Sequence, residues 1–483
     1  MSYILSIDQS TQGTKAILFD DKGNIVKRVD KAHQQLIDAN GYISHDPNEI
    51  FDNVVSVVSD VIAQSKIDAS TIQAVGISNQ RETTVMWDAD GHTLANAVVW
   101  QCSRASEIAK RYEPYKDDIF DITGLVLSPY FPASKMRWLI EYVQPQAPYY
   151  FGTMDTWLIY KLTNQQVYKT DASNASRTQL FDIHTGTWSN YLCNLFEIPK
   201  QALPEVCDSN ACFGYTDFAG LLENPIPICA VMGDSHASLY GQGCHAQGQV
   251  KTTLGTGSSI MMNIGDSYKK STNGLTTSLA WKIDGKLEYV FEGNVNYAGA
   301  VITWLQKDLQ LVDEPDDTIE AIARSNPDDE TILVPAFSGL SAPYWKEDVR
   351  ALFYGMSRTT KRNELIKATV ESIAFQISDV LHAMAKDSGL HSLEVKTDGG
   401  PSKNPYLMQF LSDMARATVY VSSQEELSAI GVAYMAGIKM GIYHKETIFS
   451  KQTYKIYETK MEISLWKQYM DRWNHAIAVL LHT

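Results

Sequence analysis

The sequence predicts an α/β protein built from two domains. Short runs rich in β-branched residues alternate with longer segments whose apolar residues recur at helical spacing, a pattern typical of α/β folds. The chain has 483 residues, which is too long for one ordinary hydrophobic core and suits two. Each half opens with two strand-like runs joined by a loop of serine, threonine and glycine, so that the two halves echo one another.

The first half predicts a strand hairpin with a following turn, then a helix and a buried strand. These elements are residues 3–8 (YILSID) and 14–20 (TKAILFD) for the hairpin, 20–24 (DDKGN) for the turn, 48–65 for the helix and 72–78 (IQAVGIS) for the strand. We expect Asn48 to cap the helix, because an amide side chain can accept a bond from a free backbone N–H there. A further apolar run, residues 225–233 (PIPICAVMG), predicts another buried strand.

The second half predicts the same kinds of element in a similar order. They are a strand, loop and strand at residues 248–265, a long amphipathic helix at 364–386, a strand ending in a glycine turn at 392–400, and a helix at 404–415. We place the domain boundary within residues 240–248 and take residues 1–244 and 245–483 as the two domains. No linker rich in glycine and serine marks it, so the domains should pack closely across a central cleft.

Composition excludes several functional classes. The formal net charge of −15 disfavours binding to nucleic acid through bulk charge, although a phosphate can still be held by local backbone amides. Asp8 interrupts the stretch where a secretion signal would be apolar, and no uncharged run approaches the length of a membrane span. The six cysteines lack metal-ligand spacing. We therefore expect a cytoplasmic protein with reduced thiols and no membrane insertion.

Three loops of small residues follow predicted strands and could hold phosphate groups: residues 8–14 (DQSTQGT), 254–259 (LGTGSS) and 398–404 (DGGPSKN). Small side chains let a phosphate approach backbone N–H groups, although tight turns require the same residues. Asp8 ends the first strand, and a carboxylate beside a phosphate loop suggests an intervening Mg²⁺. The alternative is an Asp that bonds its own turn.

Two further groups of residues suggest chemistry. Arg81 and Glu82 follow a buried strand and together could bind neighbouring hydroxyls, while the alternative is a surface ion pair. Trp100 and Tyr130 could stack on the C–H faces of a polyol or sugar, while the alternative is core packing. Asp234 follows the predicted strand at 225–233, where it could accept a proton from a hydroxyl nucleophile or simply cap a helix.

The chain resembles the FGGY carbohydrate kinases, and among them it is most similar to the glycerol kinases. The similarity extends over nearly the whole chain. It is carried by the motifs ILSIDQSTQGTKAILFD, GISNQRETTVMWD, AVVWQCSR, TGLVLSPYFPASKMRW, FGTMDTWLIYKLT, TDASNASRTQLFDIHTGTW, LGTGSS, VPAFSGLSAPYW, GMSRTTKRNELIKATVE and TDGGPSKN. Matches of this length are far more specific than a single glycine-rich loop.

The resemblance implies a two-domain ribonuclease-H/actin-like ATPase fold, in which MgATP phosphorylates a terminal hydroxyl of glycerol or a related small polyol. It implies that Asp234 is the catalytic base and Asp8 the metal ligand. The implied substrate-binding residues are Arg81, Glu82, Trp100, Tyr130, Asp234, Ser235 and Ser259. The implied ATP-binding residues are Thr11, Gln12, Lys15, Gly255, Thr256, Gly257, Gly299, Thr303, Gly400, Pro401 and Asn404. We expect a homodimer or homotetramer.

Several positions depart from the family pattern. Ser235 stands where a Gln contacts the substrate, and Ser259 stands where a Phe closes the pocket. Shorter and more polar side chains predict a roomier, wetter pocket, so a tetritol, a pentitol or a ketose of the xylulose type stays an alternative substrate. Lys15, Gln12, Thr303 and Pro401 replace the usual Arg, Thr, Gln and Ala, and none of these changes removes phosphate binding outright. The role of His236 stays open between a ligand contact and a structural contact.

Two other functions remain as alternatives. An actin-like fold can also serve an ATP-driven clamp, which would have no need for Arg81, Glu82, Trp100, Tyr130 and Asp234. A non-catalytic sugar sensor is disfavoured by the presence of both Asp8 and Asp234.

Overall fold

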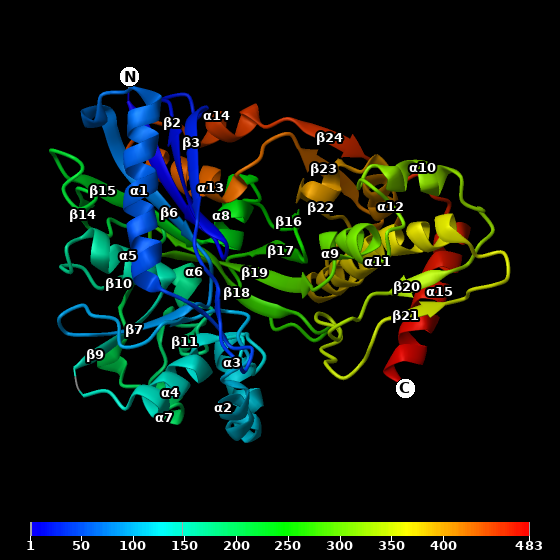
Figure 1. Ribbon diagram of the computed structural model, residues 1–483, viewed down its shortest axis with the longest axis horizontal. Coiled ribbons are helices and arrows are strands. Elements are labelled where there is room, and N and C mark those ends of the chain that lie inside the picture. The colour runs from blue at the N-terminus through cyan, green and yellow to red at the C-terminus, as the bar shows by residue number, and fades with distance from the viewer. Residues whose placement is uncertain (1, 147, 483) are drawn as a thin grey trace.

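The chain, described by a computed structural model over residues 2–146 and 148–482, is built around two mixed sheets (Figure 1). The first sheet contains, in spatial order, β14 (Tyr215–Thr216), β15 (Ile226–Gly233), β6 (Ile72–Asn79), β1 (Tyr3–Gln9), β2 (Gly13–Phe19) and β3 (Ile25–Ala32). The second contains β18 (Thr276–Ile283), β19 (Lys286–Val295), β17 (Ser258–Gly265), β16 (Gln249–Leu254), β22 (Glu394–Gly399), β23 (Thr418–Ser422) and β24 (Tyr454–Tyr457).

The two sheets repeat one topology. In the first, β1 forms an antiparallel hairpin with β2 and runs parallel to β6. In the second, β16 forms an antiparallel hairpin with β17 and runs parallel to β22. Both predicted hairpins and the resemblance between the two halves are therefore confirmed. Because each small-residue loop lies at the tip of its hairpin, the two loops occupy equivalent places in the two sheets.

Helices cover both sheets. Those over the first sheet are α1 (Pro47–Ser65), α5 (Met154–Leu162), α8 (Asp234–Gly241) and α13 (Leu427–Lys439), and those over the second are α11 (Arg362–Ser388) and α12 (Pro405–Ala415). Helix α15 (Ile463–Leu481) packs against α12 and against the strands β20 (Ile332–Val334) and β21 (Leu352–Tyr354). The remaining helices of four residues or more are α2 (Ser106–Arg111), α3 (Lys116–Thr123), α4 (Pro132–Val143), α6 (Ala172–Ala175), α7 (Asn190–Leu195), α9 (Gly299–Thr303), α10 (Asp317–Ala323) and α14 (Lys445–Ile448), besides a π-helical turn at Trp304–Asp308 and a 3-10 turn at Gly400–Lys403.

The helix predicted at residues 48–65 forms, but Asn48 does not cap it. Asp46 takes that place, because its carboxylate accepts a bond from the N–H of Asn48 while Pro47 occupies the first helical position. Proline suits that position, since its missing N–H would have no partner there in any case.

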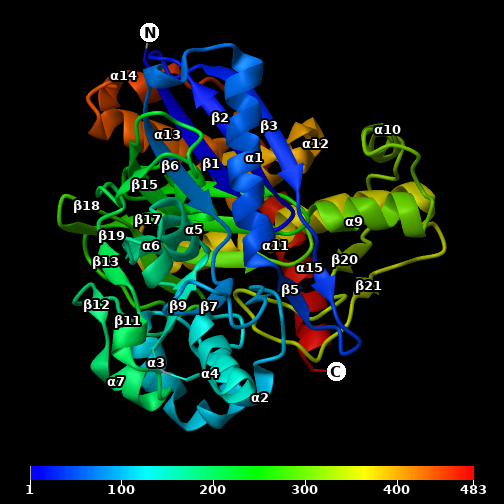
Figure 2. The ribbon, with the colours of Figure 1, turned by 60° about the vertical axis from the view of Figure 1, so that its left-hand side comes forward.

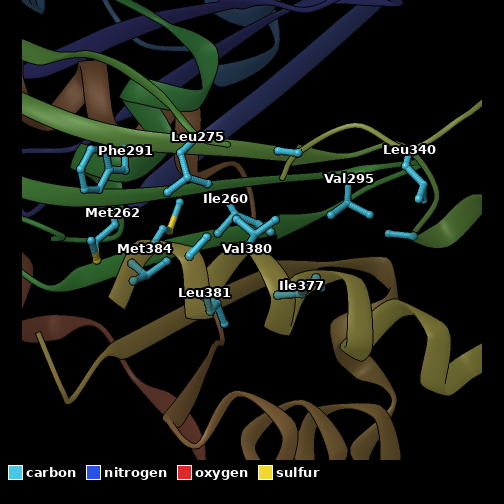
Figure 3. Close-up of a cluster of buried hydrophobic side chains, with 14 of the residues drawn as sticks. Ile260, Met262, Leu275, Phe291, Val295, Leu340, Ile377, Val380, Leu381 and Met384 are labelled. Atoms are coloured by element: carbon cyan, nitrogen blue, oxygen red, sulfur yellow. The ribbon is translucent and has the colours of Figure 1, made fainter. Parts of the chain in front are cut away.

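The second sheet rests on α11, the long amphipathic helix that the sequence predicts. Figure 3 shows one face of this helix packed against the strands above it, with apolar side chains from both elements interleaved: Ile377, Val380, Leu381 and Met384 from the helix, and Ile260, Met262, Phe291 and Val295 from the strands. These side chains are almost completely buried. The helix thus holds the β17 and β19 strands that carry part of the candidate site.

A long insertion separates β6 from β15 and forms a lobe below the first sheet (Figure 2). It contains a small sheet of β4 (Leu36–Ile37), β5 (Ile43–His45), β8 (Ala97–Val98), β7 (Thr84–Asp88) and β9 (Tyr149–Thr153), in which β4 and β5 precede the insertion in sequence. The described residues also form three two-stranded sheets: β10 (Lys169–Asp171) with β13 (Glu205–Cys207), β11 (Phe181–Asp182) with β12 (Thr187–Trp188), and β20 with β21.

The two halves of the chain meet at two helices in close contact. Helix α13, from the second half, packs against β1, β6 and β15 of the first sheet and against α8. Glycine makes this approach possible: a Cβ on Gly431 would lie 1.9 Å from the carbonyl oxygen of Ala237, and one on Gly241 would lie 2.2 Å from that of Leu427. Because Asp234 begins α8, the α8–α13 contact ties this residue to the second half of the chain.

The six cysteines are free thiols, four of them buried. Over residues 2–146 and 148–482, the structure contains no helix that is both long enough and apolar enough to cross a membrane.

Gly431→Ala tests the α8–α13 contact. Alanine favours helix formation by about 1 kcal/mol over glycine, but the added methyl group would overlap a backbone oxygen that cannot move independently, and overpacking costs roughly 1–3 kcal/mol or more. We expect the melting temperature to fall by several degrees in a thermal-shift measurement. Lys439→Ala, on the exposed last turn of the same helix, is the matched control and should melt with the wild type. A Gly431→Ala variant as stable as the wild type would show that the helices are not in tight contact.

Candidate active site

Three parallel strands end at one edge of the first sheet and bring two carboxylates together. In the register of β1, β6 and β15, both Asp8 and Met232 pair with Ser78. Asp234 follows this strand end and is the first residue of α8, so the interpretation of Asp234 as a helix cap is wrong by one position: Gly233 occupies the cap. The carboxylate of Asp234 is 35% exposed. Its Oδ1 accepts a 2.6 Å bond from the N–H of Ser235.

Asp8 is buried beside Asp234 and Lys15. Burial raises the pKa of Asp8 to about 6; the Lys15 ammonium group, 3.7 Å away, opposes this rise and the Asp234 carboxylate adds to it. Lys15 also forms a 2.6 Å ion pair with Glu426, which lies just before α13 in the second half of the chain. The strand end therefore presents two carboxylates and one amine to the boundary between the halves.

Four buried charges form a continuous network behind Asp234. Arg81 makes a bidentate bond to Glu292 of β19, at 2.7 and 3.0 Å. Arg177 donates to Glu292 at 2.7 Å and to Glu82 at 2.6 Å. Although burial by itself raises the pKa of a carboxyl group, the Arg177 and Arg81 guanidinium groups hold the pKa of Glu292 well below its ordinary value.

The network determines what Arg81 and Glu82 can do. Both side chains are buried and each is paired with a residue from another segment, so the alternative of a surface ion pair is wrong. Arg81 uses both terminal nitrogens on Glu292, and its Nε lies 3.5 Å from Oδ1 of Asp234. Glu82 adopts a left-handed backbone conformation with φ of 58°, which is uncommon for a residue with a side chain.

The two aromatic residues stand together next to the first hairpin loop. The rings of Trp100 and Tyr130 meet edge to face, with centroids 5.5 Å apart. The indole N–H of Trp100 donates a 2.9 Å bond to the hydroxyl of Thr11. Burial raises the pKa of Tyr130, followed by the effect of the Glu82 carboxylate, so its phenol stays a neutral donor. An apolar face with a polar rim results, which suits a polyol.

Ser235 and Ser259, the two residues that depart from the family pattern, touch each other across the two halves. The hydroxyl of Ser259 donates to that of Ser235 at 3.2 Å. His236, by contrast, is fully buried and lies 3.5 Å from the hydroxyl of Ser278. Burial, with the nearby Arg81 charge, lowers the pKa of His236 well below its ordinary value, so the ring is neutral. Burial beside Ser278 therefore favours a structural role for His236 over a contact with the ligand.

A separate cavity of about 480 Å³ lies in the second half of the chain. Its lining includes seven of the residues that the resemblance assigns to ATP: Gly255, Thr256, Gly299, Thr303, Gly400, Pro401 and Asn404. Apolar side chains complete the wall, among them Ile302, Val370 and Leu407. A Cβ on Gly299 would lie 2.6 Å from the carbonyl oxygen of Gly255, so only glycine lets the backbone close in this way.

The other assigned residues lie outside that cavity's lining. Thr11, Gln12 and Lys15 belong to the first hairpin, and Gly257 lies at the tip of the second, where a Cβ would meet the carbonyl oxygen of Val295 at 2.4 Å. Asn404 has a structural role as well, because its side chain caps α12 by accepting from two backbone N–H groups.

Sequence reasoning missed three charged residues of the site, namely Arg177, Glu292 and Glu426. Arg177 lies within a quoted motif without a role, and Glu292 interrupts an apolar strand, which is the one signal that could have drawn attention to it. Their functions depend on distant partners: Arg177 lies 95 residues from Glu82 and 115 from Glu292 in sequence.

Comparisons with known proteins agree with this geometry. The N-terminal domain of the FGGY family of carbohydrate kinases matches residues 3–241, and the C-terminal domain of that family matches residues 250–440. The chain is 44% identical to glycerol kinase 1 of Thermotoga maritima, with 99% of each chain covered. It is 37% identical to a glycerol kinase of Listeria welshimeri, with 98% of each covered.

Solved structures show the same fold. The crystal structure of Plasmodium falciparum glycerol kinase with ADP is 34% identical, superposes with a TM-score of 0.94, and covers 100% of this chain and 98% of its own. A ligand-bound xylulose kinase from Lactobacillus acidophilus, 21% identical, has a TM-score of 0.89 over 99% of this chain and 98% of its own, which supports the fold alone. The two-domain actin-like architecture is thus confirmed, and the chain belongs to the FGGY family of carbohydrate kinases.

Proposed function

We propose that this protein transfers the γ-phosphoryl group of ATP to a terminal hydroxyl of glycerol or a closely related small polyol. One observation carries the proposal: the Asp234 carboxylate is partly exposed at the strand edge, close to Asp8 and 3.5 Å from Arg81, and the adjacent Ser235 contacts Ser259 at the second hairpin. The similarity to glycerol kinases over nearly the full chain supports the same reaction.

In the proposed reaction, Asp234 orients the acceptor hydroxyl and takes its proton. The hydroxyl oxygen forms a bond to the γ-phosphorus as the bond from that phosphorus to the bridging oxygen breaks, and ADP leaves with the electron pair. The Nε of Arg81, 3.5 Å from Asp234, holds the carboxylate in place. A partly exposed carboxylate can reach a ligand without losing this contact.

The nucleotide would occupy the 480 Å³ cavity, with its phosphates toward the two hairpin loops. The apolar wall suits a purine base, and the glycines allow backbone N–H groups to approach phosphate oxygens. Lys15 would reach the terminal phosphate once it leaves Glu426, with which it is paired here. In that exchange the terminal phosphate takes the place of the Glu426 carboxylate, so the Lys15 ammonium group stays paired with an anion.

A magnesium ion fits the strand edge. Burial raises the pKa of the Asp8 carboxyl group to about 6, and repulsion from the Asp234 carboxylate contributes to this rise. A divalent cation bound nearby would stabilise the charged form of Asp8 against both effects. Asp8 would hold the ion through water or directly. When bound, Mg²⁺ supplies positive charge to the phosphate oxygens.

A larger acceptor is a second candidate, and the contact between Ser235 and Ser259 favours it. Ser259 pairs with Asn294 of β19, and residues directly opposite in an antiparallel pair point to the same face. The side-chain amide nitrogen of Asn294 donates to Glu292 at 3.3 Å, while its side-chain oxygen is buried and has no hydrogen-bond partner among the described residues. This wall offers hydroxyl and amide groups that could bind a fourth carbon bearing a hydroxyl.

We also propose that residues 1–244 and 245–483 act as two domains that close on the substrates, with the location cytoplasmic and the assembly a homodimer or homotetramer. Support comes from the family's two domain matches, which meet between residues 241 and 250. Sedimentation of the purified protein tests the assembly.

Asp234→Asn tests the proposed base. The amide keeps the size of the side chain but cannot accept the proton, so kcat should fall by about 10²–10⁴. The KM values for acceptor and ATP should change by less than about threefold, because binding rests on other residues. ADP affinity, measured by calorimetry, is the control for folding. A variant that retains more than half of wild-type turnover would remove Asp234 from the mechanism.

A panel of acceptors tests the substrate. ADP release should be stimulated by glycerol and, within about tenfold in kcat/KM, by a tetritol, with pentitols, ketopentoses and dihydroxyacetone measured alongside. Ser259→Phe should reduce kcat/KM for the tetritol by at least about tenfold and leave glycerol within about threefold, because the ring would fill the space of the fourth carbon.

Each other outcome of the panel is decisive. A preference of more than about tenfold for glycerol over the tetritol in the wild type would contradict the larger acceptor and leave glycerol phosphorylation standing. ATP turnover that no acceptor stimulates would contradict the kinase and favour an ATP-driven clamp.

A further inference from the structure

Lys135 is a buried amine that donates hydrogen bonds to the backbone of Glu82, Trp100 and Tyr130, the three residues that we call the acceptor wall. It lies in the first turn of α4 with no exposed surface. Its ammonium group donates to the carbonyl oxygen of Trp100 at 3.1 Å, to that of Glu82 at 3.5 Å and to that of Tyr130. These are three of the residues that the resemblance to the FGGY kinases assigns to the acceptor.

The three carbonyl groups come from separate parts of the insertion. Glu82 follows β6, Trp100 follows β8, and Tyr130 precedes α4. Each of these segments is a loop, and loops lack the regular hydrogen bonds that would fix their relative positions. One ammonium group with three donors can hold all three at once.

The surroundings of Lys135 show that it does more than fill space. Within the described residues, no carboxylate oxygen lies within 4.0 Å of the Lys135 nitrogen. The backbone carbonyl oxygens are therefore the main groups that stabilise its positive charge. Burial lowers the pKa of Lys135 to about 7, and the Glu82 carboxylate opposes this fall. Burying a cation without an ion pair lowers the stability of the folded state, and an apolar residue at this position would lower it less.

The bond to Glu82 reaches the charged network. Glu82 is held at a φ of 58°, and its side chain then accepts from Arg177. Backbone strain of this kind costs of order 1–3 kcal/mol and persists only where the surroundings enforce it. The Lys135 bond to the Glu82 carbonyl is one of the contacts that enforces it.

We propose that Lys135 is a positioning residue for the acceptor, which fixes Glu82, Trp100 and Tyr130 as one wall. The proposal rests on the proposed function, because the wall matters only if a polyol binds against it. Lys135 itself touches neither substrate in this scheme and acts through the backbone of the other three residues.

Lys135→Met tests the proposal, since methionine fills a similar volume without a donor. We expect the KM for glycerol to rise at least tenfold, with the KM for ATP within about twofold and kcat reduced by less than about tenfold. Lys396→Met is the matched control: Lys396 also donates to two backbone carbonyls, those of Gln242 and Gly243 at 2.9 and 3.0 Å, but at a distance from the wall. It should leave both KM values unchanged.

Three results would overturn the proposal: an unchanged KM for glycerol, equal rises in both KM values, or an equal effect in Lys396→Met. If Lys135→Met does not fold, Lys135→Gln, whose two amide hydrogens cannot hold all three carbonyl groups, is measured in the same way, and an unchanged KM for glycerol in that variant overturns the proposal. Wild-type activity on the acceptor panel decides the proposed function separately, so the two failures are distinguishable.

Discussion

The buried ion network centred on Glu292 is the constraint on which the candidate site depends. Glu292 comes from the second sheet, whereas Arg81, Arg177 and Glu82 belong to the first half of the chain. Two cations and two anions balance, so the group can be buried without net charge. Removing one member of such a pair costs roughly 3–5 kcal/mol because it leaves an uncompensated charge in the interior. The network therefore holds β19 of the second sheet against the first half beside Asp234.

The repeated sheet explains why the chemistry lies at the boundary. In each half, a small-residue loop joins the first two strands at the tip of their hairpin. The two loops occupy equivalent places in the two sheets, so one belongs to each side of the boundary between the halves. The parallel strands of the first sheet deliver Asp8 and Asp234 to the same edge. The hydroxyl of Ser428, from α13, then donates a 3.0 Å bond to the backbone carbonyl of Asp234, which fixes the start of α8 from the second half.

Local signals predicted a large part of this structure. Alternating apolar residues and small-residue turns gave both hairpins, because strand periodicity and turn chemistry act over a few residues. The positions of Asp8 and Asp234 at strand ends followed from the same patterns. Glu292 and Arg177 could not be predicted in this way, since a buried charge is recognised only by its partner. The cap of α1 was missed because Asn48 and Asp46 are both suitable caps, and Pro47 decides between them.

Binding of glycerol to a Glu292→Gln variant tests the central claim most directly. Calorimetric titration without nucleotide should show at least a tenfold weaker affinity for glycerol than in the wild type, because Arg81 and Arg177 lose their shared carboxylate and the wall around Asp234 loosens. The affinity for ADP should stay within about twofold, since the 480 Å³ cavity does not include these residues. An unchanged affinity for glycerol would contradict the account.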